Sequence, residues 1–237
     1  MTRLWVAIQF LTRLPTPRIV SDGADFAASI RWYPVVGLLI GGLVAGAAWL
    51  GLCIDAWTGA LCAVLVWVGV TGALHLDGLG DVADGVGAAH GDRTRLLAAM
   101  ADPHVGSFGT VSIGLQLLAK LVLLHALIDR APIALIVPIP FAARIGPLLW
   151  ARWLPALHDG LGARVAGAVR PRDLVGWSAV LLGVAVATPA LLATLMLVPT
   201  WAWWLRRRIG GISGDGHGAG IELVETGLLA AVACLHR

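Results

Sequence analysis

The chain has 237 residues, of which 58% are hydrophobic and only 13% are charged. An average soluble domain carries about 25% charged residues. The single core of a soluble chain of 237 residues could not bury so much apolar surface. The composition therefore excludes an ordinary water-soluble protein and predicts an integral membrane protein in contact with a lipid bilayer. The net charge of +3, without a basic run interleaved with aromatic residues, excludes nucleic acid as the expected partner.

The first 32 residues form an amphipathic, interrupted segment. Arg3 and Arg13 break its apolar run and no cleavage site follows, so it does not resemble a signal peptide. We expect residues 1–32 to lie in the membrane interface rather than to span the bilayer. Its apolar side is carried by Leu4, Val6, Phe10 and Leu11.

Apolar runs of about 20 residues are long enough to cross the bilayer as helices. Four such runs are Pro34–Ile54, Trp57–Leu76, Thr110–Ile128 and Pro132–Trp150. The stretch Leu174–Leu205 is too long for one helix, and Thr188-Pro189 predicts a break that makes it a hairpin. A shorter run, Ile221–Leu235, ends the chain. The prediction is an all-α, polytopic transmembrane helix bundle of about six to seven spans, forming a single integral membrane domain over residues 1–237.

The placement of arginine tests this layout, because cytoplasmic loops are enriched in Lys and Arg. Arginines precede the first run, separate the second from the third and the fourth from the fifth, and follow the hairpin as Arg206–Arg208. With the N-terminus in the cytoplasm, all these groups are cytoplasmic, and so are the polar loops. A single helix over 174–205 would put Arg206–Arg208 on the other side, which favours the hairpin.

The segment 75–109 is predicted to be an acidic, Gly-rich catalytic loop. Asp77, Asp81 and Asp84 are spaced i, i+4 and i+7, which on a helix puts three carboxylates on one face. Like charges arranged this way repel one another, and no Lys or Arg lies between Asp77 and Asp92. Hard oxygen ligands without a protein counter-ion indicate Mg²⁺ or Mn²⁺. The alternative is a solvated acidic loop between two spans.

The second half of this segment opens the third apolar run. Asp102 is either a further catalytic or metal-binding carboxylate or the cap of the following helix. Gly106, Ser107 and Gly109 would present free backbone N–H groups, which suit a phosphate. His104 is a candidate catalytic residue as a proton carrier or phosphate contact, with an interfacial role as the alternative.

A second Gly-rich acidic loop is predicted over residues 206–225. Its predicted anion-binding groups are Arg206, Arg207, Arg208, Gly210, Gly211, Ser213 and Gly214. Asp215, Glu222 and Glu225 follow and form a second candidate metal cluster. A flexible linker would explain the glycines but not two glutamates at the opening of a membrane helix.

Carboxylates, guanidinium groups and bare backbone amides on one side of a membrane favour transfer of a phosphate-linked group, because a metal can neutralise phosphate charge there. A cation-coupled transporter is the alternative from another class. The acids lie near the ends of the predicted spans rather than at their centres, which counts against transport.

Three strings occur in order along the chain: HLDGLGDVADG (75–85), MADPHVGSFG (100–109) and GGISGDGHGAGIELVE (210–225). Together with FLTRLPTP (10–17), they closely resemble the cobalamin synthase family, the adenosylcobinamide-GDP ribazoletransferases. The resemblance covers nearly the whole chain. The sequence departs from the family's usual residue types at Pro103, His104, Ile212 and His217.

The resemblance implies a Mg²⁺-dependent transferase in the bacterial cytoplasmic (inner) membrane. Such enzymes join α-ribazole, or its 5′-phosphate, to adenosylcobinamide-GDP and release GMP. Our hypothesis is that Asp77, Asp81 and Asp84, helped by Asp102 or Asp215, hold one or two metal ions against the pyrophosphate. Arg206–Arg208 would offset the charge of GMP. The first alternative is a phospholipid synthase like the CDP-alcohol phosphotransferases, and the transporter is the second. A homo-oligomer is compatible with the sequence.

Overall fold

The computed structural model describes residues 2–157, 165 and 167–236. Within this part of the chain, regular structure is helical apart from one isolated bridge between Ala156 and Ile212, as an all-α bundle requires. The first half contains α1 (Thr2–Leu11), α2 (Gly23–Ser29), η1 (Ile30–Trp32), α3 (Tyr33–Leu52), α4 (Ala56–Thr71), α5 (Leu74–Ala89) and α6 (Arg93–Met100). The second half contains α7 (Ser107–Arg130), η2 (Ile133–Ile136), α8 (Pro138–Ala143), α9 (Gly146–Trp153), α11 (Pro171–Ala187), η3 (Pro189–Ala193), α12 (Thr194–Arg208) and α13 (Gly214–Leu235).

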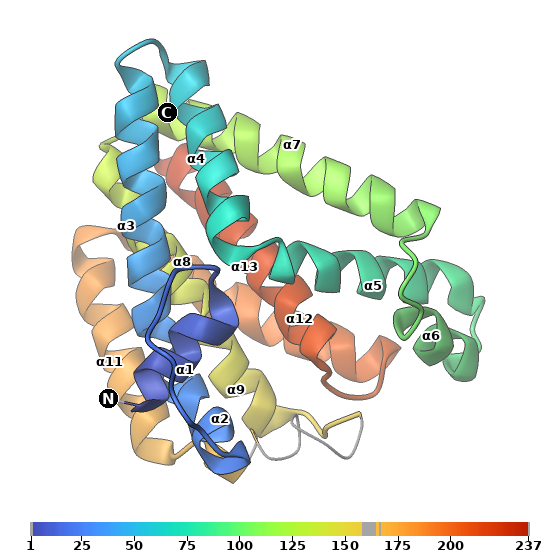
Figure 1. Cartoon of the computed structure of the whole chain (residues 1–237). Helices are drawn as coiled ribbons and strands as arrows, with labels where there is room; N and C mark the ends of the chain where they lie inside the picture. Colours follow the sequence, from blue (N-terminus) through green and yellow to red (C-terminus); the bar gives the residue numbers. More distant parts are fainter. Residues whose placement is uncertain (1, 158–164, 166, 237) are drawn as a thin grey trace.

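Helices α3 and α4 form an antiparallel pair, and α5 leaves it at a sharp angle (Figure 1). The bend follows from two consecutive left-handed residues, Gly72 (φ 61°) and Ala73 (φ 58°), which end α4 and begin α5. The two helices are inclined at 85° to each other. The predicted span Trp57–Leu76 is therefore too long, because its last residues belong to α5.

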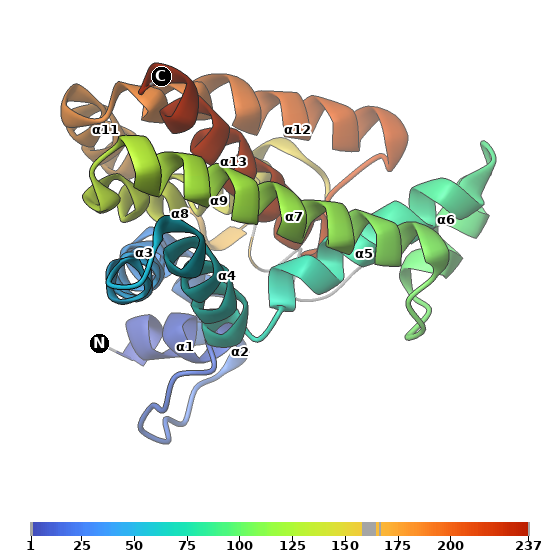
Figure 2. The same cartoon turned by 90° about the horizontal axis from the view of Figure 1, so that it is seen from above.

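Helix α13 is the central element, and it packs against α5, α7, α8, α9 and α12. Seen from above, α7 and α12 run along opposite sides of it (Figure 2). The side chain of Ser213 caps its first turn by accepting the N–H of Gly216 at 3.1 Å. Because α13 begins at Gly214, about two turns before the predicted start at Ile221, Glu222 and Glu225 lie within the helix rather than at its opening.

Among the described residues, four helical segments are long and apolar enough to cross a membrane: Gly23–Leu52, Ser107–Arg130, Ile133–Trp153 and Gly214–Leu235. The bent pair α4–α5 would add a fifth if it counts as one span. On α7 the exposed side chains Val111, Leu115, Leu118 and Val122 recur on one face of the helix. Such a continuous exposed apolar face indicates contact with lipid, so the chain is a membrane protein.

The predicted break at Thr188-Pro189 is confirmed, because α11 ends at Ala187 and η3 begins at Pro189. Helices α11 and α12 on either side of this break have 17 and 15 residues, fewer than the roughly 20 residues of a full crossing. Seven crossings, and a cytoplasmic N-terminus, therefore stay predictions.

Candidate functional site

The acidic segment predicted as a loop is helical. Asp77, Asp81 and Asp84 lie on successive turns of α5, with Asp77 exposed and the other two half-buried. Asp77 and Asp84 are both close enough to Asp81 to act on it electrostatically. Their carboxylates therefore form one negatively charged group along this helix.

Asp215 joins this group from the first turn of α13, as a third negative charge acting on Asp81. The two helices meet where Gly78 faces the Asp215 backbone: a Cβ at Gly78 would lie 2.8 Å from the Asp215 Cα. Only glycine allows this approach. Gly78 therefore serves the contact between two helices. The first carboxylate of the second acidic segment thereby joins those of the first.

Asp84 has an additional structural role. Its carboxylate accepts the backbone N–H groups of Gly106, at 2.7 Å, and Gly109, at 2.9 Å. These amides belong to the first turn of α7, which has no other side-chain cap. A charged acceptor at a helix N-terminus is favourable because it satisfies unpaired donors and opposes the helix dipole. Asp102 was a candidate for the N-terminal cap of this helix, but the cap of α7 is Asp84.

Asp102 and His104 stand apart from this group. Both are exposed, and Asp102 accepts the backbone N–H of His104 at 2.9 Å and contacts its ring Nδ1 at 2.8 Å. These two interactions hold the pKa of the Asp102 carboxyl below its ordinary value. Asp102 is not among the charges that act on Asp81. The structure therefore does not bring the predicted pair Asp102 and His104 to the other acids.

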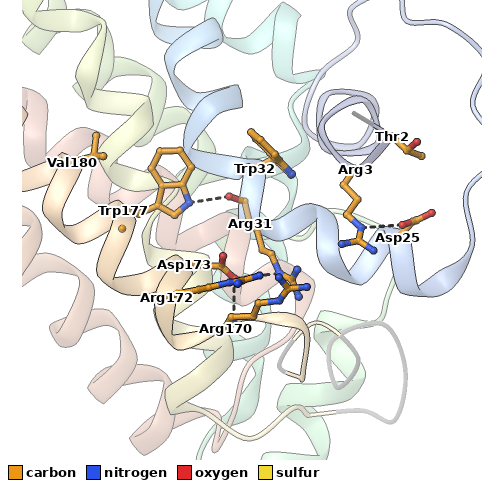
Figure 3. Close-up of a pocket in the computed structure, with 11 residues that line it drawn as sticks. Thr2, Arg3, Asp25, Arg31, Trp32, Arg170, Arg172, Asp173, Trp177 and Val180 are labelled. Carbon is orange, nitrogen blue, oxygen red and sulfur yellow. Dashed lines mark hydrogen bonds and ion pairs between the residues drawn. The ribbon is translucent and has the colours of Figure 1, made fainter.

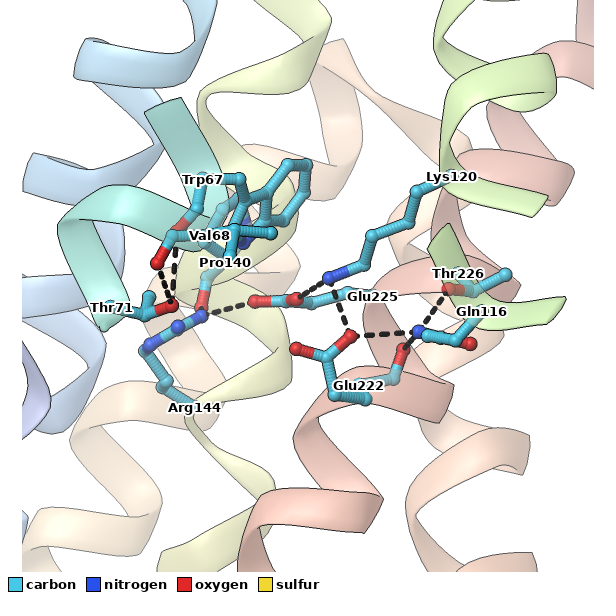
Figure 4. A network of polar contacts seen from close by, with 10 residues as sticks. All are labelled: Trp67, Val68, Thr71, Gln116, Lys120, Pro140, Arg144, Glu222, Glu225 and Thr226. Atoms are coloured by element: carbon cyan, nitrogen blue, oxygen red, sulfur yellow. Dashed lines mark hydrogen bonds and ion pairs between the residues drawn. The ribbon is translucent and has the colours of Figure 1, made fainter. Parts of the chain in front are cut away.

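Glu222 and Glu225 are buried in the bundle and are bound to cations of the chain itself (Figure 4). Lys120 Nζ lies 2.7 Å from a carboxylate oxygen of each glutamate. Arg144 donates to Glu225 at 2.5 Å, and Gln116 donates to Glu222 at 2.8 Å. The prediction that these glutamates hold a metal is corrected by this arrangement, since ammonium and guanidinium groups already neutralise their charge.

This buried polar network joins α7, the α8–α9 break and α13. Arg144 is fully buried at the break, between Ala143 and Gly146, which interrupts the predicted span Pro132–Trp150. Neither Lys120 nor Arg144 was predicted from the sequence as a partner of these glutamates. A signal was present, because Lys120 is the only lysine of the chain and lies inside an apolar run, where an ionisable residue is costly. Glu222 and Glu225 also lie well inside α13. The argument against a transporter expected the acids near the ends of the spans, and these two acids do not meet that expectation.

Two glycines of the last predicted loop are engaged with protein. Gly210 has φ 89°, and its Cα faces the guanidinium of Arg93, where a Cβ would lie 2.8 Å from Nη2. Gly211 packs against the carbonyl of Pro155, next to the hydrogen bond from Ile212 N to Pro155 O at 2.9 Å. Neither glycine therefore offers a free surface to a phosphate.

The other predicted anion-binding residues have different surroundings. Ser213 caps α13, and Gly214 is exposed with open space where a Cβ would stand. Arg206, Arg207 and Arg208 are exposed at the end of α12, where the Arg207 guanidinium lies 4.7 Å from the ring centre of Trp203. Gly214 and these arginines remain accessible to a ligand.

A second basic surface joins the N-terminal segment to the start of α11 (Figure 3). It is a groove of about 750 Å³ lined by Arg3, Arg31, Arg170 and Arg172. Two of these arginines are paired, Arg3 with Asp25 at 3.0 Å and Arg31 with Asp173 at 3.2 Å. These two segments lie far apart along the chain, and their contact was not predicted from the sequence.

A smaller cavity of about 260 Å³ lies beside the acids. Asp77 and Asp215 line it together with His75 and His217. Carboxylates that line a cavity can act on the polar end of a bound molecule whose apolar end is held inside. We call the group Asp77, Asp81, Asp84 and Asp215 the acidic cluster.

The acidic cluster offers carboxylate oxygens from two helices to a divalent cation. Among the described residues, no three His, Cys, Asp or Glu side chains converge as a ready-made metal site. Mg²⁺ rarely uses such an all-protein cage: it keeps several waters and is usually held by one or two carboxylates together with substrate phosphates. The hard oxygen donors of the cluster therefore suit a cation that is shared with a phosphorylated substrate.

Comparison with known proteins places the chain in a family. The sequence profile of cobalamin-5-phosphate synthase matches residues 3–233. The chain belongs to the cobalamin-5-phosphate synthase family. It is 63% identical to an adenosylcobinamide-GDP ribazoletransferase of Novosphingobium aromaticivorans, over 96% of this chain and 94% of the relative.

Further relatives of the cobalamin-5-phosphate synthase family bear the same description. A ribazoletransferase of Thiobacillus denitrificans is 44% identical over 98% of this chain and 96% of its own length. One from Halorubrum lacusprofundi is 37% identical over the whole chain and 96% of its own length. No solved structure matches the chain. The resemblance of the three acidic and glycine-rich strings is thereby confirmed at the level of the family.

Proposed function

We propose that this chain transfers the adenosylcobinamide phosphate moiety of adenosylcobinamide-GDP to α-ribazole or α-ribazole 5′-phosphate. The products are adenosylcobalamin, or its 5′-phosphate, and GMP. The family and the printed descriptions of its relatives support the reaction. Asp77 and Asp81 meet Asp215 across the α5–α13 contact. This observation is our reason for assigning the reaction to these residues.

The reaction moves one phosphorus between two oxygens. A ribazole hydroxyl attacks the phosphorus on the cobinamide side of the pyrophosphate, and the bond from that phosphorus to the bridging oxygen breaks. GMP leaves with the bridging oxygen, and the hydroxyl proton passes to a carboxylate or to water. We assign Asp77, Asp81 and Asp215 to this step, with Asp84 holding the α7 N-terminus beside them.

Mg²⁺ or Mn²⁺ is the cofactor that this donor set would hold, through Asp77, Asp81 and Asp215 together with the substrate pyrophosphate. When bound, the cation supplies neutralisation of phosphate charge. The exposed Arg206–Arg208 and the exposed backbone at Gly214 would bind the anionic leaving group.

We further propose that the protein lies in the bacterial cytoplasmic membrane with the acidic cluster on the cytoplasmic side. The arginine distribution supports this orientation, because Arg206–Arg208 and Arg93 lie on the same end of the bundle as the cluster. The turn between α3 and α4, which carries the exposed Cys53, would then face the periplasm. A variant that retains only this cysteine should react with an impermeant maleimide added outside the inner membrane. Labelling only after the membrane is broken would reverse the orientation.

The reaction is tested by GMP release from adenosylcobinamide-GDP and α-ribazole by the purified, detergent-solubilised protein, with Mg²⁺ or with a chelator. We expect release only with the cation present. Asp81→Asn should lower the rate at least about 100-fold, the scale on which removal of one group that stabilises a transition state acts. Asp129→Asn is the matched control, since Asp129 is exposed at the far end of α7 and contacts only its neighbour Arg130 among the ion pairs described. Full activity of Asp81→Asn would overturn the assignment of the acidic cluster.

A further inference from the structure

The cavity beside the acidic cluster has a largely apolar wall. It lies between α1, α2, the start of α3 and the first turns of α5 and α13, and it measures about 260 Å³. Apart from the acids and histidines, its character is set by Phe10, Leu11, Phe26, Ile30, Tyr33 and Ile221. Such a wall favours a ligand with an apolar body and polar groups at one end.

Three aromatic side chains form one side of this cavity. The rings of Phe10 and Phe26 meet edge to face with centroids 5.1 Å apart. The rings of Phe10 and Tyr33 are stacked at 6.2 Å. Aromatic faces bind planar rings by offset stacking or edge-to-face contact, so this wall favours a flat, aromatic ligand.

Two of the residues that line this cavity, His75 and His217, carry buried polar atoms without a partner among the described residues. His75 is only 3% exposed, and within the described chain neither of its ring nitrogens has a hydrogen-bond partner. The Nδ1 of His217 is also buried and without a partner there. Buried polar atoms in native proteins are nearly always hydrogen-bonded. A neutral imidazole offers one donor and one acceptor, so His75 and His217 are suited to the heteroatoms of a bound ring.

Size and polarity select among the substrates of the proposed reaction. Ligand pockets usually measure about 300–1,000 Å³, so this cavity suits a bicyclic ring and is far too small for a corrin macrocycle with its side chains. A guanine base carries polar groups around its edge, and most of them would face apolar walls without partners. A benzimidazole nucleoside presents one free ring nitrogen on an otherwise apolar bicycle.

We propose that this cavity binds the benzimidazole base of the ribazole acceptor. The inference rests on the proposed function. The base stacks on the wall of Phe10, Phe26 and Tyr33, and its free nitrogen accepts a hydrogen bond from His75 or His217. The sugar is directed toward Asp77 and Asp215, which line the same cavity. The acceptor hydroxyl is thereby held at the acidic cluster, while the larger corrinoid substrate approaches from outside.

Direct binding tests this assignment separately from turnover. Labelled α-ribazole is dialysed against the detergent-solubilised full chain in the absence of adenosylcobinamide-GDP. Phe26→Ala and His75→Phe should each weaken binding at least about fivefold, as expected for one lost ring contact or one lost hydrogen bond. In GMP-release assays the KM for α-ribazole should rise by a similar factor, while the KM for adenosylcobinamide-GDP stays within about twofold.

His125→Phe is the matched control for His75→Phe, because His125 stacks on Trp57 outside the cavity. Free benzimidazole should displace labelled α-ribazole from the unmodified protein, and adenine should not, which tests the cavity without any substitution. Unchanged α-ribazole binding in both cavity variants, or no displacement by benzimidazole, would overturn the inference even where GMP is released. Ribazole binding without GMP release by the unmodified protein would instead refute the proposed function alone.

Discussion

Replacing Lys120 with Met removes one cation from a buried network of two cations and two anions. Lys120 contacts both Glu222 and Glu225, whereas the ion pair described for Arg144 is with Glu225. The side chains involved are at most 4% exposed. After the substitution, Glu222 has no remaining cationic partner in the described network, and water cannot reach it to compensate.

The expected loss in the free energy of unfolding follows from this burial. Breaking a buried ion pair by removing one partner costs about 3–5 kcal/mol, because the other charge is left buried and uncompensated. For a chain of this size, 1 kcal/mol corresponds to about 2–4 °C in the midpoint of thermal unfolding. We therefore expect Lys120→Met to lower that midpoint in detergent by about 10 °C.

A second substitution makes the prediction specific. Lys120→Met combined with Glu222→Gln removes one cation and one anion, so the remaining pair of Glu225 and Arg144 is balanced. Gln116, which donates to Glu222 at 2.8 Å, can still donate to the amide oxygen of Gln. The double variant should therefore be more stable than Lys120→Met alone, by about 2 kcal/mol or more in a double-mutant cycle.

The measurement is thermal unfolding of the detergent-solubilised variants, followed by circular dichroism, with Lys120→Arg as the control that keeps the charge. The reasoning is wrong if Lys120→Met unfolds at the temperature of the unmodified protein. It is also wrong if the double variant is no more stable than the single one, since charge balance would then not explain the loss.

Two further substitutions test the contacts that assemble the acidic cluster. Gly78→Ala places a Cβ against the Asp215 backbone and should separate α5 from α13, lowering GMP release at least about tenfold with helix content unchanged by circular dichroism. Gly69→Ala, where a Cβ meets open space, should leave the rate unaltered, and equal rates for both variants would contradict the proposed contact. Asp84→Ala removes the charged acceptor of the α7 N-terminus and should destabilise the protein by about 2–3 kcal/mol in thermal unfolding. Asp84→Asn keeps one acceptor oxygen and should lose less, so a larger loss for Asn than for Ala would refute the capping role.

Local pattern predicted much of the fold. Apolar run length located α3 and α7 to within a few residues of their ends, because a helix that crosses lipid must satisfy its own backbone and stay apolar over a fixed length. The break before Pro189 was also predictable, since proline lacks the backbone donor that a continuous helix needs. The bend at Gly72 and Ala73 was missed, because alanine gives no local sign of a left-handed conformation.

Part of the candidate site was also predictable from the local sequence. The spacing of Asp77, Asp81 and Asp84 alone indicated carboxylates on one face of a helix. The sequence could not distinguish Asp215, which joins them, from Glu222 and Glu225, which do not. All three acids follow the same Gly-rich turn, and their difference lies in which elements face them.

By itself, the sequence determined that this protein is helical and membrane-embedded, and that its candidate site acids lie in the segments 75–109 and 206–225. Only the tertiary structure decided how each carboxylate is neutralised: Glu225 by Lys120 and Arg144 inside the bundle, and Asp84 by the amides of α7. The physical reason is that a charge in a low-dielectric interior is stabilised by whatever lies within a few ångströms of it. Those neighbours come from helices distant in the chain, so helix packing, not local sequence, selects them.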